Sequence, residues 1–203
     1  MRKVRNTLRG LLQAYGPEHV KRRLWNSEFS GGRWNCLDET SGDCVYPYVE
    51  TYANHGSILD LGCGSGSTGN ELAAGACQHY TGVDISEVAI EKARRRTEEN
   101  GRADSHRYES ADIFSYVPSQ TFDVILFRDS IYYVPHGKIA RMLERYASYL
   151  RPGGVFIVRM SNGTGKYQPI VDIIETRFDL VGGHVSDGPP AIVLIFRPRS
   201  PAN

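Results

Sequence analysis

The sequence has few of the features that mark secreted, membrane-spanning or metal-binding proteins. Its longest apolar runs, at residues 124–127, 155–158 and 192–196, are far shorter than the roughly 20 residues that a membrane-spanning helix needs. No apolar segment or cleavage site follows the basic residues 2–5, so no signal peptide is predicted. The four cysteines form no CxxC pair and have no histidine at a zinc-binding spacing. We therefore predict no metal site and a cytoplasmic protein with reduced thiols.

An excess of charge of one sign is also lacking. The chain has 203 residues, with 24 Lys and Arg against 23 Asp and Glu, and a net charge of +1. Basic residues cluster near the N-terminus and at residues 94–96, but acidic residues balance them. This balance argues against a nucleic-acid or membrane partner and favours a small-molecule one. The sequence leaves open whether the protein is a monomer or a homodimer.

Apolar runs alternate with helix-like segments from about residue 45 onward. We predict strands at residues 57–61, 80–83, 105–110, 122–127 and 155–160, and helices at 17–25, 45–54, 68–74, 86–100, 137–150 and 169–177. Two further strands, at 178–185 and 191–196, are joined without a helix and so must pair antiparallel. The fold class is therefore α/β, a doubly wound and mostly parallel sheet over residues 45–203. Residues 1–44 form an N-terminal extension.

A glycine-rich turn follows the first predicted strand. Glycines at 62, 64, 66 and 69 satisfy the spacing of a dinucleotide-binding loop. Such a loop holds an anionic pyrophosphate, which the carboxylate of Asp60 would repel. An acid at this position suits a ligand with a positive centre, and S-adenosylmethionine carries a sulfonium and an ammonium. The sequence therefore favours this methyl donor over a nicotinamide dinucleotide, which remains the alternative.

Two further acids follow the second and third predicted strands. Asp84 is placed to accept both hydroxyls of a ribose, and Ile85 offers an apolar face to the adenine. Taken alone, Asp84 is also explained as an acid at a helix N-terminus. Asp112 is placed to accept the adenine amino group, with the amide of Ile113 beside the ring.

Five segments together resemble a known family. The series ILDLGCGSG (58–66), TGVDIS (81–86), SADIF (110–114), FDVILFRDSIYYV (122–134) and LRPGGVFIV (150–158) is similar to the class I S-adenosylmethionine-dependent methyltransferases over about residues 45–200. The resemblance implies a seven-stranded sheet of order 3-2-1-4-5-7-6. It also implies contacts to the methionine portion of the donor from Asp60, Gly62, Cys63, Gly64 and Gly66. Asp84 would bind the ribose, and Asp112 and Ile113 the adenine.

The end of the fourth strand points to the reacting methyl in this family. Arg128 is predicted to contact the carboxylate of the donor or a neighbouring loop. The candidate catalytic residues are Asp129, Tyr132 and His136, because each could orient or deprotonate an acceptor. His136 has the most suitable ordinary pKa, although it is equally well placed to begin the next helix in solvent. Tyr132 and Tyr133 are also expected to form a wall of the pocket.

Aromatic residues among glycines mark the end of the extension, at residues 25–34. One hypothesis is a lid that places Trp34 against the sulfonium through a cation–π contact. The other is that Trp25 and Trp34 only pack the extension onto the sheet.

The predicted function is transfer of a methyl group to oxygen or nitrogen of a small-molecule acceptor. The signatures of DNA amino-methyltransferases and protein-arginine methyltransferases are missing near strand four, whereas RNA and other protein substrates stay open. A protein that binds the donor without turnover is a further alternative.

Overall fold

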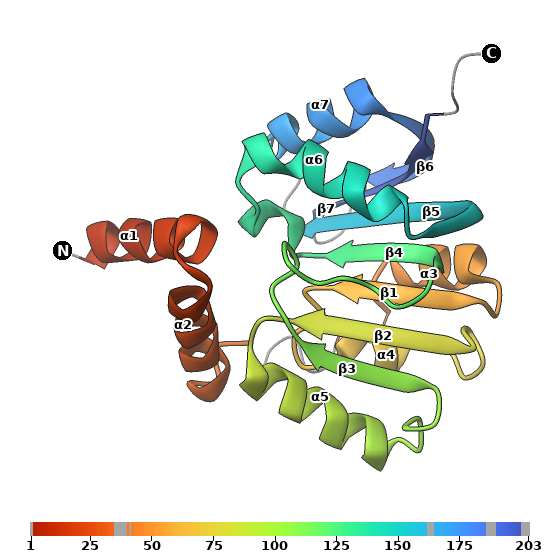
Figure 1. Cartoon of the computed structure of the whole chain (residues 1–203), viewed down its shortest axis with the longest axis horizontal. Helices are drawn as coiled ribbons and strands as arrows, with labels where there is room; N and C mark the ends of the chain where they lie inside the picture. Colours follow the sequence, from red (N-terminus) through yellow and green to blue (C-terminus); the bar gives the residue numbers. More distant parts are fainter. Residues whose placement is uncertain (1, 35–39, 41, 162–164, 186–189, 200–203) are drawn as a thin grey trace.

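The computed structural model describes residues 2–34, 40, 42–161, 165–185 and 190–199. A seven-stranded sheet forms its centre, in the order β3-β2-β1-β4-β5-β7-β6 (Figure 1). Its strands are β1 (Ser57–Leu61), β2 (His79–Asp84), β3 (His106–Ser110), β4 (Phe122–Arg128), β5 (Leu150–Ser161), β6 (Phe178–Val185) and β7 (Ala191–Pro198). The pairs among β1 to β5 are parallel, and β7 runs antiparallel to both β5 and β6. The predicted fold class and strand order are confirmed.

Helices cover both faces of this sheet, so its central strands are buried on both sides. One face packs against α3 (Tyr46–Ala53), α4 (Ser67–Glu71) and α5 (Glu87–Glu99), and the other against α6 (His136–Ala147) and α7 (Gln168–Arg177). Helix α6 buries the apolar face formed by Ile139, Met142, Leu143 and Tyr146. The helix predicted at residues 137–150 ends at Ala147, and Leu150 begins β5.

A side-chain cap begins α5. Ser86 Oγ accepts a hydrogen bond from the amide of Ala89 at 3.2 Å. The helix ends at Asn100, and Gly101 follows with a φ of +66°, a conformation that suits glycine. This cap fixes the start of α5 directly behind the end of β2, where Asp84 lies.

The N-terminal extension contains two helices, α1 (Arg2–Tyr15) and α2 (Glu18–Ser30). The helix predicted at residues 17–25 is confirmed and continues further. We did not predict α1, although Leu8, Leu11, Leu12 and Tyr15 follow the spacing of one helical face. Both helices lie beside the carboxyl ends of β1 to β4 (Figure 1), so the extension adjoins the edge where sheets of this type bind ligands.

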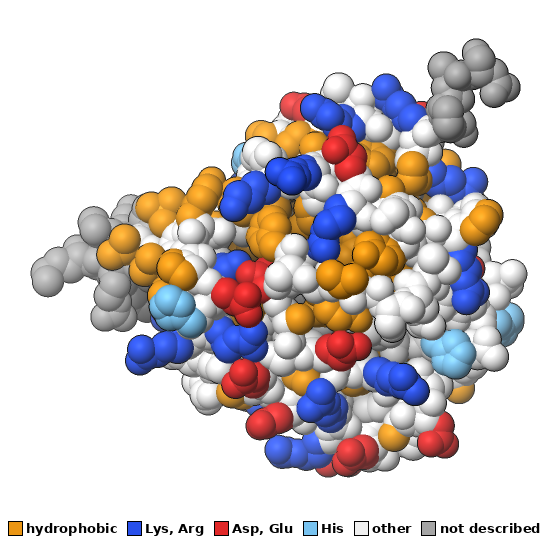
Figure 2. Space-filling model, in the orientation of Figure 1, with side chains coloured by type: hydrophobic (Ala, Val, Ile, Leu, Met, Phe, Trp, Pro, Cys, Tyr) orange, Lys and Arg blue, Asp and Glu red, His pale blue; other side chains and the backbone are white. Residues whose placement is uncertain are grey.

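Charges of both signs are interspersed on the face shown in Figure 2. This distribution agrees with the near-zero net charge of the sequence. Among the described residues, no helix is long and apolar enough to cross a membrane.

Candidate active site

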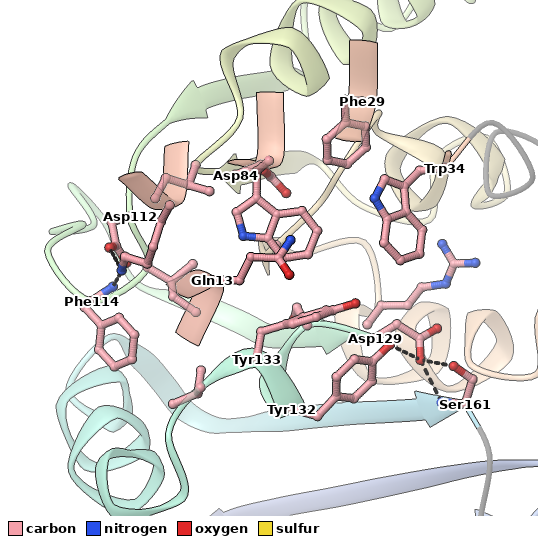
Figure 3. A pocket seen from close by; sticks show the side chains of 18 residues that line it. Gln13, Phe29, Trp34, Asp84, Asp112, Phe114, Asp129, Tyr132, Tyr133 and Ser161 are labelled. Atoms are coloured by element: carbon pink, nitrogen blue, oxygen red, sulfur yellow. Dashed lines mark hydrogen bonds and ion pairs between the residues drawn. The ribbon is translucent and has the colours of Figure 1, made fainter. Parts of the chain in front are cut away.

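A cavity of about 200 Å³ opens at the carboxyl ends of the central strands. Its walls come from the extension and from the segments that follow β1, β2, β3 and β4, so residues far apart in the sequence share one space (Figure 3). The cavity is lined by Gln13, Lys21, Trp25, Phe29, Trp34, Gly62, Asp84, Ile85, Asp112, Ile113, Phe114, Arg128, Asp129, Ser130, Tyr132, Tyr133, Val134 and Ser161.

The glycine turn brings backbone close to this cavity. Gly62, Gly64 and Gly66 all have positive φ, at +85°, +54° and +78°. A Cβ atom on Gly62 would lie 2.4 Å from the Cβ of Ser130, so the turn also needs glycine to fit against the segment after β4. Of the predicted loop residues, Gly62 lines the cavity directly. Cys63 is buried, and burial raises the pKa of its thiol well above the ordinary value, which keeps it protonated.

Asp84 joins the glycine turn to the start of α5. Its carboxylate accepts hydrogen bonds from the amides of Gly64, at 3.0 Å, and Ser86, at 2.8 Å. Burial raises the pKa of Asp84 to about 6, although these amides favour the ionised form. The side chain lines the cavity beside Ile85, as a ligand for ribose hydroxyls would have to.

Asp60 lies one layer deeper. Its carboxylate is buried, and Oδ2 accepts a hydrogen bond of 2.5 Å from the hydroxyl of Tyr80. Burial raises the pKa of Asp60 to about 6, while the bond from Tyr80 lowers it. Asp60 does not line the cavity; its carboxylate is buried and hydrogen-bonded to Tyr80 of β2. Its predicted contact with a donor stays a prediction.

Asp112 and Ile113 line the cavity after β3, as predicted for an adenine site. Lys21 of α2 forms an ion pair with Asp112 and lies 5.2 Å from the ring centre of Phe114. Lys21 is not among the predicted site residues, and only its place in an amphipathic segment could have suggested a contact. The ion pair closes one end of the cavity with a residue from the extension.

Helix α2 is held to this end of the sheet by several polar contacts. Arg22 donates to the hydroxyl of Ser110 at 2.7 Å and to the carbonyl of Ile85 at 3.2 Å. Asn26 accepts a bond of 2.8 Å from the hydroxyl of Ser86, and Lys92 donates to the last turn of α2. These contacts position the aromatic side chains of α2 over the cavity.

The segment after β4 has a strained backbone at Asp129, whose φ is +54°. Few residues other than glycine adopt this conformation, and Asp is among those that tolerate it. The carboxylate accepts bonds of 2.7 Å from both the amide and the hydroxyl of Ser161, and pairs with Arg159. Strain of this kind concentrates at functional sites. Asp129 faces the cavity (Figure 3).

Arg128 lines the cavity but is already paired. Its guanidinium donates to Asp43 at 2.9 Å and 3.1 Å. Asp43 lies 3.5 Å from Arg159, so one ionic network joins Asp43 to β4 and β5. The predicted contact between Arg128 and a neighbouring loop is present, and a contact with the donor carboxylate stays a prediction.

Aromatic rings from the extension and from the segment after β4 also line the cavity. Trp25 lies edge-on to Tyr133 at 4.8 Å and 6.2 Å from Trp34. Tyr132 lies 4.8 Å from Tyr133 and stacks on Tyr167 at 4.9 Å. Burial raises the pKa of Tyr133 to about 12 and that of Tyr132 further. Both hydroxyls therefore stay protonated at neutral pH.

His136 is the predicted residue that the structure does not bring to the site. It is the first residue of α6, is exposed, and is not among the residues that line the cavity. Its proposed role as a general base stays a prediction. Of the three catalytic candidates, Asp129 and Tyr132 share the cavity.

A family model matches the part of the chain that contains the glycine turn and the end of β4. The model of a methyltransferase domain matches residues 58–154, which span the glycine turn, Asp84 and the segment after β4. Residues 58–154 therefore carry the methyltransferase domain, and the sheet has the strand order that the resemblance to class I methyltransferases implies. Among the residues that the structure describes, no group of His, Cys, Asp and Glu could hold a metal ion.

Named relatives match the same region. The chain is 34% identical over 97 residues to the ubiquinone biosynthesis O-methyltransferase of Aromatoleum aromaticum, covering 48% of this chain and 40% of that protein. It is 27% identical over 139 residues to the 27-O-demethylrifamycin SV methyltransferase of Amycolatopsis mediterranei, covering 65% and 50%. The chain thus spans about half the length of these relatives.

Solved structures share the fold of this chain. The N-methyltransferase NodS of Bradyrhizobium japonicum, in complex with S-adenosylhomocysteine, superposes with a TM-score of 0.70 at 17% identity, covering 88% of this chain and 98% of that one. The magnesium protoporphyrin IX methyltransferase of Synechocystis with bound S-adenosylhomocysteine gives 0.70 at 17%, covering 89% and 100%. At this identity the likeness concerns the fold.

Proposed function

We propose that the protein transfers a methyl group from S-adenosylmethionine to an oxygen or nitrogen atom of a small-molecule acceptor. One observation carries the proposal: the glycine turn, Asp84 and the end of β4 meet around one cavity at the carboxyl ends of the strands. The names of the matched relatives, which are O-methyltransferases in the first two cases, support the same reaction class.

The residues of the cavity fit the proposed donor. Asp84 offers carboxylate oxygens to the ribose, and the glycines of the turn let backbone approach the methionine portion. Asp112 offers an acceptor to the adenine amino group beside Ile113. The donor supplies, when bound, an electrophilic methyl group on a sulfonium.

The residues after β4 would then prepare the acceptor. The acceptor atom forms a bond to the methyl carbon as the carbon–sulfur bond breaks, so an acceptor hydroxyl or ammonium must also lose its proton. Asp129 and Tyr132 both line the cavity after β4, and the hydroxyl of Tyr132 donates a hydrogen bond of 3.4 Å to the carboxylate of Asp129. In this proposal the carboxylate of Asp129 takes up the proton of the acceptor. The aromatic wall excludes water from the reaction.

The extension, residues 1–44, acts in this proposal as a lid on the cavity. Lys21, Trp25, Phe29 and Trp34 all line it. Two roles are open to Trp34 in this proposal: it contacts the sulfonium, or it only packs the extension against the sheet. We further propose a cytoplasmic protein, as a monomer or homodimer, which light scattering of the purified chain would determine.

Calorimetric titration tests the first step. We expect S-adenosylmethionine and S-adenosylhomocysteine to bind and NAD not to bind. Absence of binding by both adenosyl compounds at high micromolar concentration would contradict the proposal. A screen of acceptors that measures released S-adenosylhomocysteine then separates an enzyme from a protein that binds the donor without turnover.

A further inference from the structure

The cavity contains a continuous series of aromatic rings. Figure 3 shows Trp34 on one side of the cavity and Tyr132 and Tyr133 on the other. Trp25 connects the two sides, at 6.2 Å from Trp34 and 4.8 Å from Tyr133. Tyr167 supports Tyr132 from behind, with the two rings 11° from parallel. Because each ring packs on the next, the cavity offers flat apolar faces in fixed positions.

The charges near these rings are already compensated. Arg128 pairs with Asp43, and Asp129 pairs with Arg159. A phosphate or carboxylate would have to compete with Asp43 for Arg128, and an ammonium would have to compete with Arg159 for Asp129. The cavity is therefore a poor site for an acceptor recognised by charge.

The hydroxyls beside the rings are engaged as well. Ser130 donates to the carbonyl of Leu61 at 2.6 Å, and Ser161 donates to Asp129 at 2.7 Å. A sugar needs several side chains that are free to accept and donate. Neither of these two serine hydroxyls has a proton left to donate to one.

One polar atom of the wall does call for a ligand. The indole nitrogen of Trp34 is buried and has no hydrogen-bond acceptor among the residues that the structure describes. An indole N–H can only donate, and a buried donor without a partner lowers stability. An oxygen atom of a bound molecule would satisfy it.

We propose, resting on the methyl-transfer function above, that the acceptor is a planar unsaturated ring with at least one oxygen substituent. The ring packs between Trp34 and the Tyr132–Tyr133 side of the cavity, and its oxygen accepts a hydrogen bond from Trp34 Nε1. Aromatic stacking selects flat rings over saturated ones, and the indole N–H selects oxygenated rings over hydrocarbons.

Three probes test the two parts of this proposal. 2-Naphthol is flat and oxygenated, decahydro-2-naphthol is oxygenated but saturated, and naphthalene is flat without oxygen. Their dissociation constants are measured by equilibrium dialysis with saturating S-adenosylhomocysteine, so that the adenine region is occupied. We expect 2-naphthol to bind about fivefold or more tightly than either of the other probes, from stacking in one comparison and a hydrogen bond in the other.

Variants of the wall give an independent measurement. Trp34→Phe keeps a ring but removes the N–H, so we expect it to abolish the preference for 2-naphthol over naphthalene. Tyr133→Leu is expected to weaken both flat probes and leave decahydro-2-naphthol unchanged. Tyr15→Leu, at a 65% exposed ring of α1 outside the cavity, is the matched control. Circular dichroism confirms that each variant is folded.

The outcomes separate this inference from the proposed function. If S-adenosylhomocysteine itself does not bind, the proposed function fails. If it binds but the saturated probe, or methyl glucoside, binds as well as 2-naphthol, only the aromatic acceptor is overturned. A preference for 2-naphthol over naphthalene that survives in Trp34→Phe would overturn the role of the indole N–H.

Discussion

Tyr80 of β2 donates a hydrogen bond of 2.5 Å to Asp60 of the neighbouring strand β1, and both side chains are buried. Tyr80 also stacks on His106, with the ring centres 5.1 Å apart. The hydroxyl favours the ionised carboxylate, which burial disfavours, so the pKa of Asp60 is about 6 instead of its ordinary value. The bond from Tyr80 thus offsets part of the rise that burial causes in the pKa of Asp60.

This pair predicts a pH dependence of donor binding. Affinity for S-adenosylhomocysteine, measured by calorimetry, should rise as the pH increases through about 6, since the pKa values of Asp60 and Asp84 both lie there. Tyr80→Phe removes the hydrogen bond that lowers the pKa of Asp60 and should move the midpoint to higher pH. Tyr116→Phe, whose hydroxyl contacts Glu109, is the control. An identical midpoint in Tyr80→Phe would contradict the proposed role of the hydroxyl.

The same pair affects stability. A carboxyl with a raised pKa in the folded state holds its proton there longer than in the unfolded chain, so its contribution to the free energy of unfolding falls as pH rises from about 4 to about 6. His106, whose pKa burial lowers to about 4, contributes in the opposite direction up to its ordinary pKa. The two are separated by comparing Tyr80→Phe with the natural chain in urea at several pH values. Above pH 6, Asp60 is already ionised in the natural chain but still partly protonated in Tyr80→Phe, so the free energy of unfolding of the variant should go on falling there. A difference in free energy of unfolding between the two proteins that stays constant with pH would contradict this.

Local patterns predicted most of the fold, and long-range contacts account for what they missed. The strand order was implied by the resemblance of five segments to a known family, whereas the antiparallel pairing of β6 and β7 was predicted from their direct joint, because parallel neighbours need a crossover. Cavity residues such as Asp84 and Asp112 could be predicted since each lies at or just beyond the carboxyl end of a strand. Lys21 and Arg159 could not, because their partners Asp112 and Asp129 are distant in sequence. His136 shows the reverse: it follows β4 closely, but α6 begins at that residue and leaves it exposed.

Asp84 should be essential for donor binding. Asp84→Ala removes the acceptor for two amides, from Gly64 and Ser86, together with the proposed ribose ligand. Since bonds to a charged acceptor contribute about 1.5–3 kcal/mol each, we expect affinity for S-adenosylhomocysteine to fall about 100-fold or more in calorimetry. Asp172→Asn on the exposed side of α7 should have no effect. A loss below tenfold in Asp84→Ala would show that the donor is held elsewhere.

Asp129 should matter for both backbone geometry and turnover. Asparagine tolerates positive φ and keeps an oxygen for Ser161, whereas alanine does neither. We expect Asp129→Ala to lower the free energy of unfolding by about 1–3 kcal/mol more than Asp129→Asn, measured in urea. If the carboxylate also accepts the acceptor's proton, both variants should lose turnover while Asp129→Asn still binds S-adenosylhomocysteine. Full turnover in Asp129→Asn would restrict the residue to a structural role.

His136 provides the matching test outside the cavity. Because its side chain is exposed at the start of α6, His136→Ala should fold normally and bind S-adenosylhomocysteine as the natural chain does. Turnover with an acceptor identified in the screen then decides its role. A general base at His136 requires a fall of about 100-fold in kcat, at the lower end of what such catalysis contributes, and a changed pH profile of kcat. An unchanged kcat and pH profile would end that hypothesis and leave Asp129 as the ionisable candidate, since burial keeps Tyr132 protonated.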